Sequence, residues 1–229
     1  MNSIVVTGTS RGIGLEMTRQ LLTSGHNVFA LARAPLKSFG LMELKEKFHA
    51  KLTVSTVDVA NDAHVREFAQ SLDGGTIIDT VINNAGIYGE DATFEELSLD
   101  EVQRTIAVNA VAPMRITRAL LPFLTKATNP KLIHITSLMG SIADNNGGSH
   151  YGYRMSKAAL NMFNKSFSID YPEITSMVVH PGWVKTDMGG SAAPLEIKDS
   201  AMGILALVEK ATRDDNGKFF DYKGKSLPW

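Results

Sequence analysis

The chain of 229 residues contains no cysteine, which excludes disulfides, thiolate metal sites and cysteine nucleophiles. It also lacks a charge bias: the formal net charge is -1 and the pI is about 6.6. Neither nucleic acid nor an anionic membrane is therefore an expected partner. No apolar run reaches the roughly 18 residues of a membrane span, and the start MNSIVVTG has no basic segment typical of a signal peptide. We expect a cytoplasmic protein.

No repeat, low-complexity tract or linker interrupts the chain. Short apolar runs alternate with longer segments of helical period, which is the pattern of βαβ units. This predicts one α/β domain over residues 1–229, with a parallel sheet of about seven strands. The expected strands lie near Ser3–Thr7, Val28–Ala32, Leu52–Val57, Ile77–Ile82, Lys131–Thr136, Ser176–His180 and Lys218–Phe220. The expected helices lie near Gly14–Ser24, Leu41–Phe48, Ala63–Leu72, Asp100–Lys126, Gly152–Asp170 and Ser200–Ala211.

The helix expected near Asp100–Lys126 has a proline well inside it. Ser98 and Glu101 have the spacing of a capping box, which supports a start there. Pro113 has no N–H to donate to the carbonyl four residues back, that of Asn109. The helix should therefore kink and leave this carbonyl free for a water or a ligand. A misplaced helix boundary is the alternative interpretation.

A glycine-rich turn, TGTSRGIG, joins the first expected strand to the first expected helix. Gly8, Gly12 and Gly14 let the backbone turn sharply and approach a bound group, and the helix N-terminus offers unpaired N–H groups. The turn is typical of a pyrophosphate site. Its spacing, G-x-x-x-G-x-G, differs from the commoner dinucleotide fingerprint. A purely structural turn is the alternative, which the strand before it and the helix after it disfavour.

The second expected strand indicates which dinucleotide is preferred. Sites for NAD(H) usually carry an acidic residue at the end of this strand, but here none appears before Glu43. Arg33 follows the strand instead, and Arg11 lies in the glycine-rich turn. Two guanidinium groups suit a 2'-phosphate, so NADP(H) is favoured. The alternative is two solvated arginines and a site that also accepts NAD(H).

Tyr153 and Lys157 are four residues apart in an expected helix. This spacing places a phenol and an ammonium on one helix face. A nearby cation favours the phenolate, so we expect a lowered tyrosine pKa and proton exchange near neutral pH. Taken alone, a tyrosine and a lysine at this spacing are more often two residues on a solvated helix face.

Together these motifs resemble the short-chain dehydrogenase/reductase family over the full length of the chain. The matching segments are TGTSRGIG at 7–14, NNAG at 83–86, VNAVAP at 108–113, the serine at 137, YRMSK at 153–157 and PGWVKTDMGG at 181–190. Within the family, the chain looks most like the branch of the Sniffer carbonyl reductases and the bacterial C-factor proteins. The resemblance implies a doubly wound Rossmann fold with helices on both faces of the sheet.

The resemblance also implies four catalytic residues. Tyr153 would be the general acid/base, and Lys157 would bind the nicotinamide ribose and depress the tyrosine pKa. Ser137 would hydrogen-bond the substrate oxygen. The main-chain carbonyl of Asn109 would hold a water that relays protons to the lysine.

Cofactor contacts are implied along the whole chain. Val184 and Thr186 match positions that bond the nicotinamide carboxamide, and Asp58 matches one that contacts adenine. The NNAG turn matches a segment along the cofactor but can equally be pure architecture. No metal is expected. The implied cofactor-binding residues are Gly8, Ser10, Arg11, Gly12, Ile13, Gly14, Arg33, Asp58, Val59, Asn84, Ala85, Gly86, Tyr153, Lys157, Pro181, Gly182, Val184 and Thr186.

The expected function is an NADPH-dependent carbonyl reductase acting on a small-molecule carbonyl or alcohol, with alcohol oxidation as the reverse direction. A nucleotide-binding regulatory or signalling protein of the same fold is the alternative. The substrate pocket should be built from residues 138–152, from Ile87 and Tyr88, and from a loop at about 183–199. Gly189 and Gly190 would let this loop close over the cofactor. We expect a homodimer or homotetramer formed through the two long helices.

Overall fold

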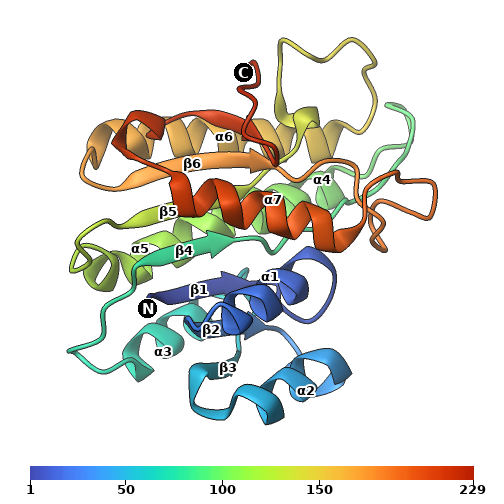
Figure 1. Cartoon of the computed structure of the whole chain (residues 1–229). Coiled ribbons are helices and arrows are strands. Elements are labelled where there is room, and N and C mark those ends of the chain that lie inside the picture. The colour runs from blue at the N-terminus through green and yellow to red at the C-terminus, as the bar shows by residue number, and fades with distance from the viewer.

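The computed structural model describes all residues, 1–229, and contains one seven-stranded sheet (Figure 1). Every strand pair in it is parallel, as the alternating pattern predicts. The strands are β1 (Ser3–Thr7), β2 (Asn27–Ala32), β3 (Leu52–Thr56), β4 (Thr80–Asn83), β5 (Lys131–Ile135), β6 (Thr175–His180) and β7 (Phe219–Asp221). The helices are α1 (Gly12–Thr23), α2 (Phe39–Phe48), α3 (Asp62–Ser71), α4 (Leu99–Ile106), α5 (Ala112–Leu124), α6 (Tyr151–Asp170) and α7 (Ile197–Lys210).

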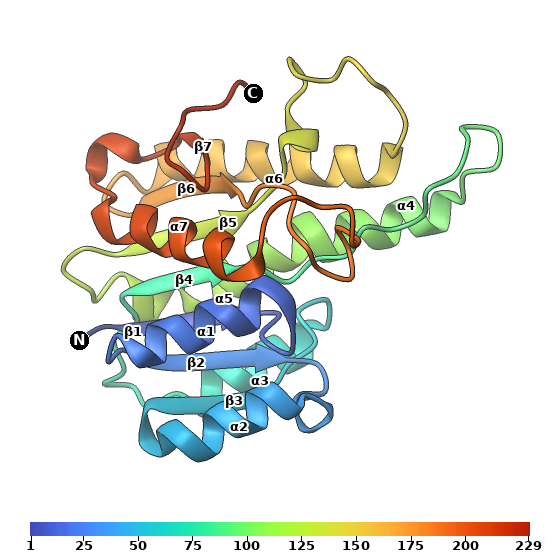
Figure 2. The same ribbon diagram turned by 45° about the vertical axis from the view of Figure 1, so that its right-hand side comes forward.

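The strand order is β3-β2-β1-β4-β5-β6-β7, so the direction of winding reverses between β1 and β4. Ligands of doubly wound sheets bind outside the carboxyl ends of the strands at such a reversal. In Figures 1 and 2 the connections that follow β4, β5 and β6 all lie at this end of the sheet. The predicted fold class is confirmed.

Each face of the sheet is buried against helices because neighbouring strand residues point to opposite sides. Ile4 and Val6 belong to a core cluster with residues of α1, α2 and α7. Val5, between them, belongs to a second cluster with residues of α3, α5 and α6. No helix combines the length and the apolar character needed to cross a membrane.

Several elements begin or end one to three residues from the expected boundaries, and two of the differences have a clear physical cause. The apolar stretch from Ile77 predicts a strand, but β4 begins only at Thr80, because the Ile78 N–H donates to the Phe123 carbonyl (3.2 Å) at the end of α5. The long helix expected around Pro113 is two α-helices joined by a π-helical turn, Ala107–Val111. The turn lies where the proline removes a hydrogen bond, so the predicted irregularity is confirmed.

The start of α4 is also confirmed, although its capping box is incomplete. The Ser98 hydroxyl accepts from the Glu101 N–H at 3.3 Å. The Glu101 carboxylate pairs with Arg104 at 2.9 Å. Glu90 accepts from the Ser98 N–H instead, at 3.0 Å.

Candidate active site

The glycine-rich turn between β1 and α1 has the shape of an anion site. Gly8 and Gly12 have φ angles of 72° and 58°, which glycine adopts without strain. A Cβ on Gly14 would lie 2.3 Å from the Gly8 carbonyl oxygen, so only glycine fits there. No side chain caps α1 and its first turn has no acidic residue. Its N–H groups are therefore available to a phosphate, and the turn fits a dinucleotide.

The NNAG segment after β4 is bonded to this turn. The N–H groups of Asn84 and Ala85 both donate to the Thr7 hydroxyl, each at 3.0 Å. The Asn84 side-chain amide donates to the Thr7 carbonyl at 2.9 Å. These bonds support the architectural interpretation of the segment. Its contact with a cofactor stays a prediction.

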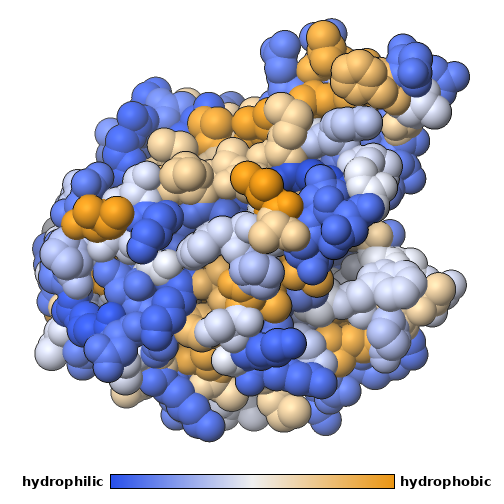
Figure 3. All heavy atoms as spheres, turned by 90° about the horizontal axis from the view of Figure 1, so that it is seen from above, coloured by the Kyte–Doolittle hydropathy of each residue, from blue (hydrophilic) through white to orange (hydrophobic).

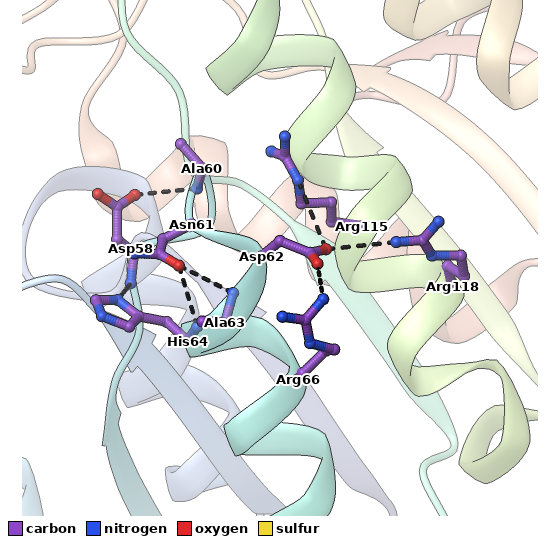
Figure 4. A network of polar contacts seen from close by, with 9 residues as sticks. All are labelled: Asp58, Ala60, Asn61, Asp62, Ala63, His64, Arg66, Arg115 and Arg118. Atoms are coloured by element: carbon purple, nitrogen blue, oxygen red, sulfur yellow. Dashed lines mark hydrogen bonds and ion pairs between the residues drawn. The ribbon is translucent and has the colours of Figure 1, made fainter.

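Asp58 lies in the turn after β3, where its carboxylate accepts from the Ala60 N–H at 3.0 Å. Figure 4 shows this carboxylate pointing away from the neighbouring carboxylate of Asp62. Asp58 therefore closes its own turn, and the predicted adenine contact stays a prediction. Asp62 forms ion pairs with three arginines of α3 and α5, namely Arg66, Arg115 and Arg118.

The two arginines expected to hold a 2'-phosphate are both exposed. Arg33 follows β2. Arg11 pairs with Asp187 of the 183–199 loop, with an Nη1 to Oδ2 distance of 2.8 Å. The sequence did not point to this partner, since 176 residues separate the two and no motif links them.

The 183–199 loop is closed by its own hydrogen bonds. Its two ends meet where the Lys185 N–H donates to the Leu195 carbonyl at 2.9 Å. The indole of Trp183 donates to the Gly189 carbonyl at 2.8 Å, and the Gly189 N–H donates to the Thr186 hydroxyl at 3.0 Å. A Cβ on Gly189 would lie 2.0 Å from the Val184 oxygen. Gly189 thus permits a tight internal contact, while closure over a cofactor stays a prediction.

Just before this loop, the chain leaves β6 through two further predicted residues. The Pro181 carbonyl accepts from the Ser200 hydroxyl at 2.6 Å. Gly182 has a φ of 85°, and a Cβ there would meet Leu195 at 2.7 Å. This backbone is fixed against the start of α7.

The four predicted catalytic residues are all buried. Ser137 lies at the carboxyl end of β5, Tyr153 and Lys157 lie near the start of α6, and Asn109 lies in the π-helical turn between α4 and α5. Ser137 directly follows the residue after β5, and its hydroxyl accepts from the Met139 N–H at 3.1 Å. The Asn109 amide donates to the Ile87 carbonyl (2.8 Å) and to the Ser156 hydroxyl (2.9 Å). The side chain of Asn109 therefore braces the segment after β4 against α6.

Lys157 is hydrogen-bonded to the last residue of β5. Its ammonium donates to the Ile135 carbonyl at 2.9 Å and lies 5.6 Å from the centre of the Tyr153 ring. Burial lowers the pKa of Lys157 to about 8. A Cβ on Gly86 would lie 3.7 Å from this ammonium, so the NNAG segment and the lysine meet.

The expected lowering of the Tyr153 pKa is wrong for this structure. Burial raises the pKa of Tyr153 to about 12, although a hydrogen bond with Ser137 acts in the opposite direction and Tyr88 adds to the rise. The spacing of Tyr153 and Lys157 predicts their proximity but not the loss of water around the phenol. The Lys157 ammonium is engaged by a carbonyl rather than by the phenol oxygen.

This arrangement of a buried serine, tyrosine and lysine beside a glycine-rich turn is what the family resemblance predicts. Residues 2–196 match the family described as short chain dehydrogenase. The chain belongs to this family.

Among curated relatives of this short-chain dehydrogenase, the C-signal of Myxococcus xanthus is 42% identical over 167 residues, which cover 72% of the chain and 100% of the relative. Two solved structures are similar along the whole chain. The carbonyl reductase Sniffer of D. melanogaster is 34% identical with a TM-score of 0.95, and covers 100% of both chains. The NADPH-bound carbonyl reductase from chicken fatty liver is 33% identical with a TM-score of 0.93, and covers 100% of this chain and 99% of its own.

The surface at this end of the short-chain dehydrogenase is mixed in character. Figure 3 views the molecule from above and shows apolar groups interrupted by hydrophilic ones, with a hollow at the right-hand edge, the end to which the strands run in Figure 1. The pocket segments predicted from the sequence contain four large apolar side chains, of which Ile142, Trp183 and Met188 are exposed and Met139 is partly buried.

The contact between two polar residues near Tyr153 escaped prediction, although His150 belongs to the segment 138–152 expected to line the substrate pocket. His150 precedes α6, and Asp91 lies in the segment before α4. The His150 Nδ1 and Asp91 Oδ1 atoms lie 3.0 Å apart and form an ion pair when the histidine is protonated. The sequence separates them by 59 residues and no motif joins them. The only available signal is that His150 stands one helix turn before Tyr153.

Proposed function

We propose that this short-chain dehydrogenase is an NADPH-dependent carbonyl reductase. The observation that carries the proposal is the convergence of Ser137, Tyr153 and Lys157, all buried, at the carboxyl end of the sheet. The similarity to two carbonyl reductases over the whole chain supports the reaction type.

In the proposed mechanism, the chain binds and orients a carbonyl compound and controls one proton. NADPH, when bound, supplies a hydride from its nicotinamide to the carbonyl carbon. The Ser137 hydroxyl hydrogen-bonds the carbonyl oxygen, and Tyr153 donates its phenolic proton to the same oxygen. A tyrosine that is protonated at neutral pH is suited to the reducing direction, because it begins as the acid.

Lys157 and Asn109 support this proton transfer. A Lys157 pKa near 8 leaves the ammonium mostly charged at neutral pH, so it stabilises the phenolate after the proton has left. Asn109 holds the segment that follows β4, which faces this lysine through Gly86.

The preference for NADPH is supported by the charges around the glycine-rich turn. Arg11 and Arg33 are exposed there, and the second strand ends without a carboxylate. The chicken carbonyl reductase with bound NADPH has the same fold along its whole length.

A second candidate function is signalling, which the 42% identity to the C-signal favours. All four catalytic residues are nevertheless present and buried in this chain. The two functions differ in what they require: a signal that depends on nucleotide binding alone would survive loss of the Tyr153 hydroxyl, whereas reduction would not.

The test follows NADPH and NADH absorbance with a panel of aldehydes, ketones and quinones. Tyr153→Phe should lower kcat by about 100-fold or more and leave the Kd of NADPH unchanged. Tyr151→Phe is the matched control, because Tyr151 is exposed on the same helix, and it should keep wild-type activity. Absence of turnover with every carbonyl compound, or full activity of Tyr153→Phe, would contradict the proposal.

The proposal includes assembly into a homodimer or homotetramer through α5 and α6. A groove of about 360 Å³ crosses the outer surface of these helices and is lined mainly by apolar side chains, including Val111, Met114 and Phe163. A second copy of the chain would cover it. Light scattering tests this: Met114→Glu should give a monomer, and a wild-type chain that is already monomeric would contradict it.

A further inference from the structure

Tyr88 packs directly against the proposed catalytic tyrosine. The centres of the Tyr88 and Tyr153 rings are 4.8 Å apart, with 40° between the ring planes. The Tyr88 hydroxyl reaches the Nδ1 atom of His150 at 3.1 Å. The Asp91 carboxylate lies 3.0 Å from this same nitrogen. A chain of contacts therefore runs from Asp91 through His150 and Tyr88 to Tyr153.

Tyr88 is held in place from both sides in the sequence. Its predecessor, Ile87, exchanges two hydrogen bonds with the Asn109 side chain, at 2.8 and 2.9 Å. Its successor, Gly89, has a φ of 79°, and a Cβ there would meet the Thr105 hydroxyl at 2.4 Å. This backbone has little freedom to move the Tyr88 ring away from Tyr153.

His150 is held in an unusual backbone conformation. Ser149 and His150 both have a φ of 51°, in the left-handed region that residues other than glycine seldom adopt. Such strain persists only where the surroundings impose it, and it concentrates at functional sites. Here it directs an imidazole toward Tyr88 immediately before α6 begins.

The Nδ1 atom of His150 can accept a hydrogen bond from Tyr88 or donate one to Asp91, but it cannot do both at once. With Nδ1 unprotonated, His150 accepts a hydrogen bond from the Tyr88 hydroxyl. With Nδ1 protonated, it donates to the Asp91 carboxylate, and Tyr88 loses its acceptor. A histidine cation always carries a proton on Nδ1, so protonation favours Asp91 over Tyr88.

We propose that His150 is a positioning residue, which acts on Tyr153 through the hydroxyl and ring of Tyr88. The inference rests on the proposed reductase function of the same site. Neutral His150 with its proton on Nε2 fixes Tyr88 against Tyr153 by accepting from its hydroxyl at Nδ1, and a proton on Nδ1 releases the Tyr88 hydroxyl. A proton on Nδ1 of His150 should therefore lower activity for a reason that lies outside the four predicted catalytic residues.

The groups that face His150 determine this balance. Asp91 and Tyr88 face it from the segment before α4, while Arg154 and Tyr153 belong to α6, the helix that His150 precedes. Arg154 is tied down by a hydrogen bond from its Nε to the Gly148 carbonyl at 2.8 Å. Burial raises the pKa of Tyr88, with Asp91 adding to the rise and Arg154 opposing it, so Tyr88 remains a hydrogen-bond donor throughout the pH range of interest.

Three variants test the proposal. Tyr88→Phe keeps the ring contact with Tyr153 and removes the hydroxyl. His150→Ala removes the imidazole. His150→Asn is the conservative variant, because asparagine tolerates the left-handed conformation and its amide reaches the place of Nδ1 but does not titrate.

Steady-state kinetics with NADPH and a carbonyl compound that the wild type reduces are measured from pH ~5.5 to pH ~8.5, so that a protonation-dependent step is seen in the pH profile. At pH ~8, Tyr88→Phe and His150→Ala should each lower kcat about threefold to tenfold without changing the Kd of NADPH. The double variant Tyr88→Phe/His150→Ala should have a kcat no lower than either single variant, because both substitutions remove the same interaction. His150→Asn should retain kcat at pH ~8 and lose the histidine-dependent fall in acid.

A measurement without turnover separates this inference from the proposed function. The 15N chemical shift of His150 Nδ1 should change in Tyr88→Phe, because Nδ1 loses the hydroxyl that bonds it. A wild-type chain that reduces no carbonyl compound would contradict the proposed function while leaving this shift to be measured. The role of His150 would be overturned by unchanged kinetics in Tyr88→Phe and His150→Asn at every pH, or by an unchanged Nδ1 shift. Additive losses in the double variant would also overturn it. The first two results can be obtained even if His150→Ala fails to fold.

Discussion

The catalytic region and the cofactor edge of this molecule are built differently. Ser137, Tyr153 and Lys157 are 8%, 8% and 5% exposed, and each is fixed by neighbours in β5 or α6. The side chains of Arg11 and Asp187, across the glycine-rich turn, are 75% and 73% exposed. The proposed reaction chemistry thus lies in the core, and the charges proposed to select a cofactor lie in water.

This difference predicts where substitutions matter. For a buried ionisable group, each unit of pKa difference between the folded and unfolded chains changes the free energy of unfolding by up to ~1.36 kcal/mol. A displaced backbone in the same region also moves the groups proposed to react. At the exposed edge, an ion pair contributes only about 0.2–1 kcal/mol. Changes in the core should therefore alter stability and kcat together, whereas changes at the edge should alter cofactor affinity alone.

The largest effect is expected from His134, a fully buried residue of β5. Burial, with a smaller contribution from Lys157, lowers the pKa of His134 to about 3. The folded chain keeps His134 neutral, while the unfolded chain binds a proton below pH ~6.5, so stability is lost as pH falls through this window. By pH ~4.5 this single group costs about 2–3 kcal/mol.

Urea unfolding of wild type and His134→Asn at pH ~7 and pH ~4.5 measures this cost. Asparagine does not titrate and keeps an acceptor for Asn83, which contacts His134 at 3.2 Å. The difference in unfolding free energy between the two chains should change by about 2–3 kcal/mol across this range. The exposed His49→Asn is the control, and an equal pH dependence in all three chains would show that His134 is not buried as described.

Gly140 gives the next largest effect, because it packs on the backbone of α6 beside the catalytic lysine. A Cβ there would lie 2.7 Å from Lys157 Cβ and 2.9 Å from its carbonyl carbon. Gly140→Ala should cost about 1–3 kcal/mol of stability and lower kcat roughly tenfold or more by displacing Lys157 from Tyr153. Thermal unfolding and initial rates measure both effects. Gly147→Ala, in the same connection but with room for a Cβ, should change neither.

At the exposed edge, Arg11→Gln should act on cofactor choice without altering stability. Loss of one charge-assisted hydrogen bond to a 2'-phosphate should raise the Kd of NADPH roughly tenfold, about 1.4 kcal/mol, and leave the Kd of NADH within about twofold. Titration of protein fluorescence with each dinucleotide measures the two constants. Equal weakening of both would show that Arg11 binds something other than the 2'-phosphate.

The fold was predictable because its determinants are local. Alternation of apolar runs and helical segments specifies a parallel sheet, and Pro113 alone marked the place of the π-helical turn. The start of β4 was not predictable from apolar character, since Ile78 is buried but bonded to α5 rather than to the sheet.

Only the residues of the candidate site that belong to sequence motifs were predictable. The motifs named Ser137, Tyr153 and Lys157, but the direction of the Tyr153 pKa depends on burial, which spacing does not encode. The contacts of His150 with Tyr88 and of Arg11 with Asp187 join segments 62 and 176 residues apart. Such pairs exist only once the connections after β1, β4, β5 and β6 meet at one end of the sheet.

The smallest effect is expected from Asp187, the partner of Arg11. A 2'-phosphate and the Asp187 carboxylate are both anions that one guanidinium can pair with, so Asp187→Asn should remove a competitor and tighten NADPH binding. Because the pair is exposed, the gain should be no more than about 1 kcal/mol, up to roughly fivefold in Kd, and it should shrink as salt is added. NADH binding should not change, and Asp187→Asn in an Arg11→Gln background should have no effect on either cofactor. Weaker NADPH binding in Asp187→Asn would instead mean that the pair holds the 183–199 loop in the shape the cofactor needs, so that even an exposed ion pair at this edge contributes to the architecture of the site.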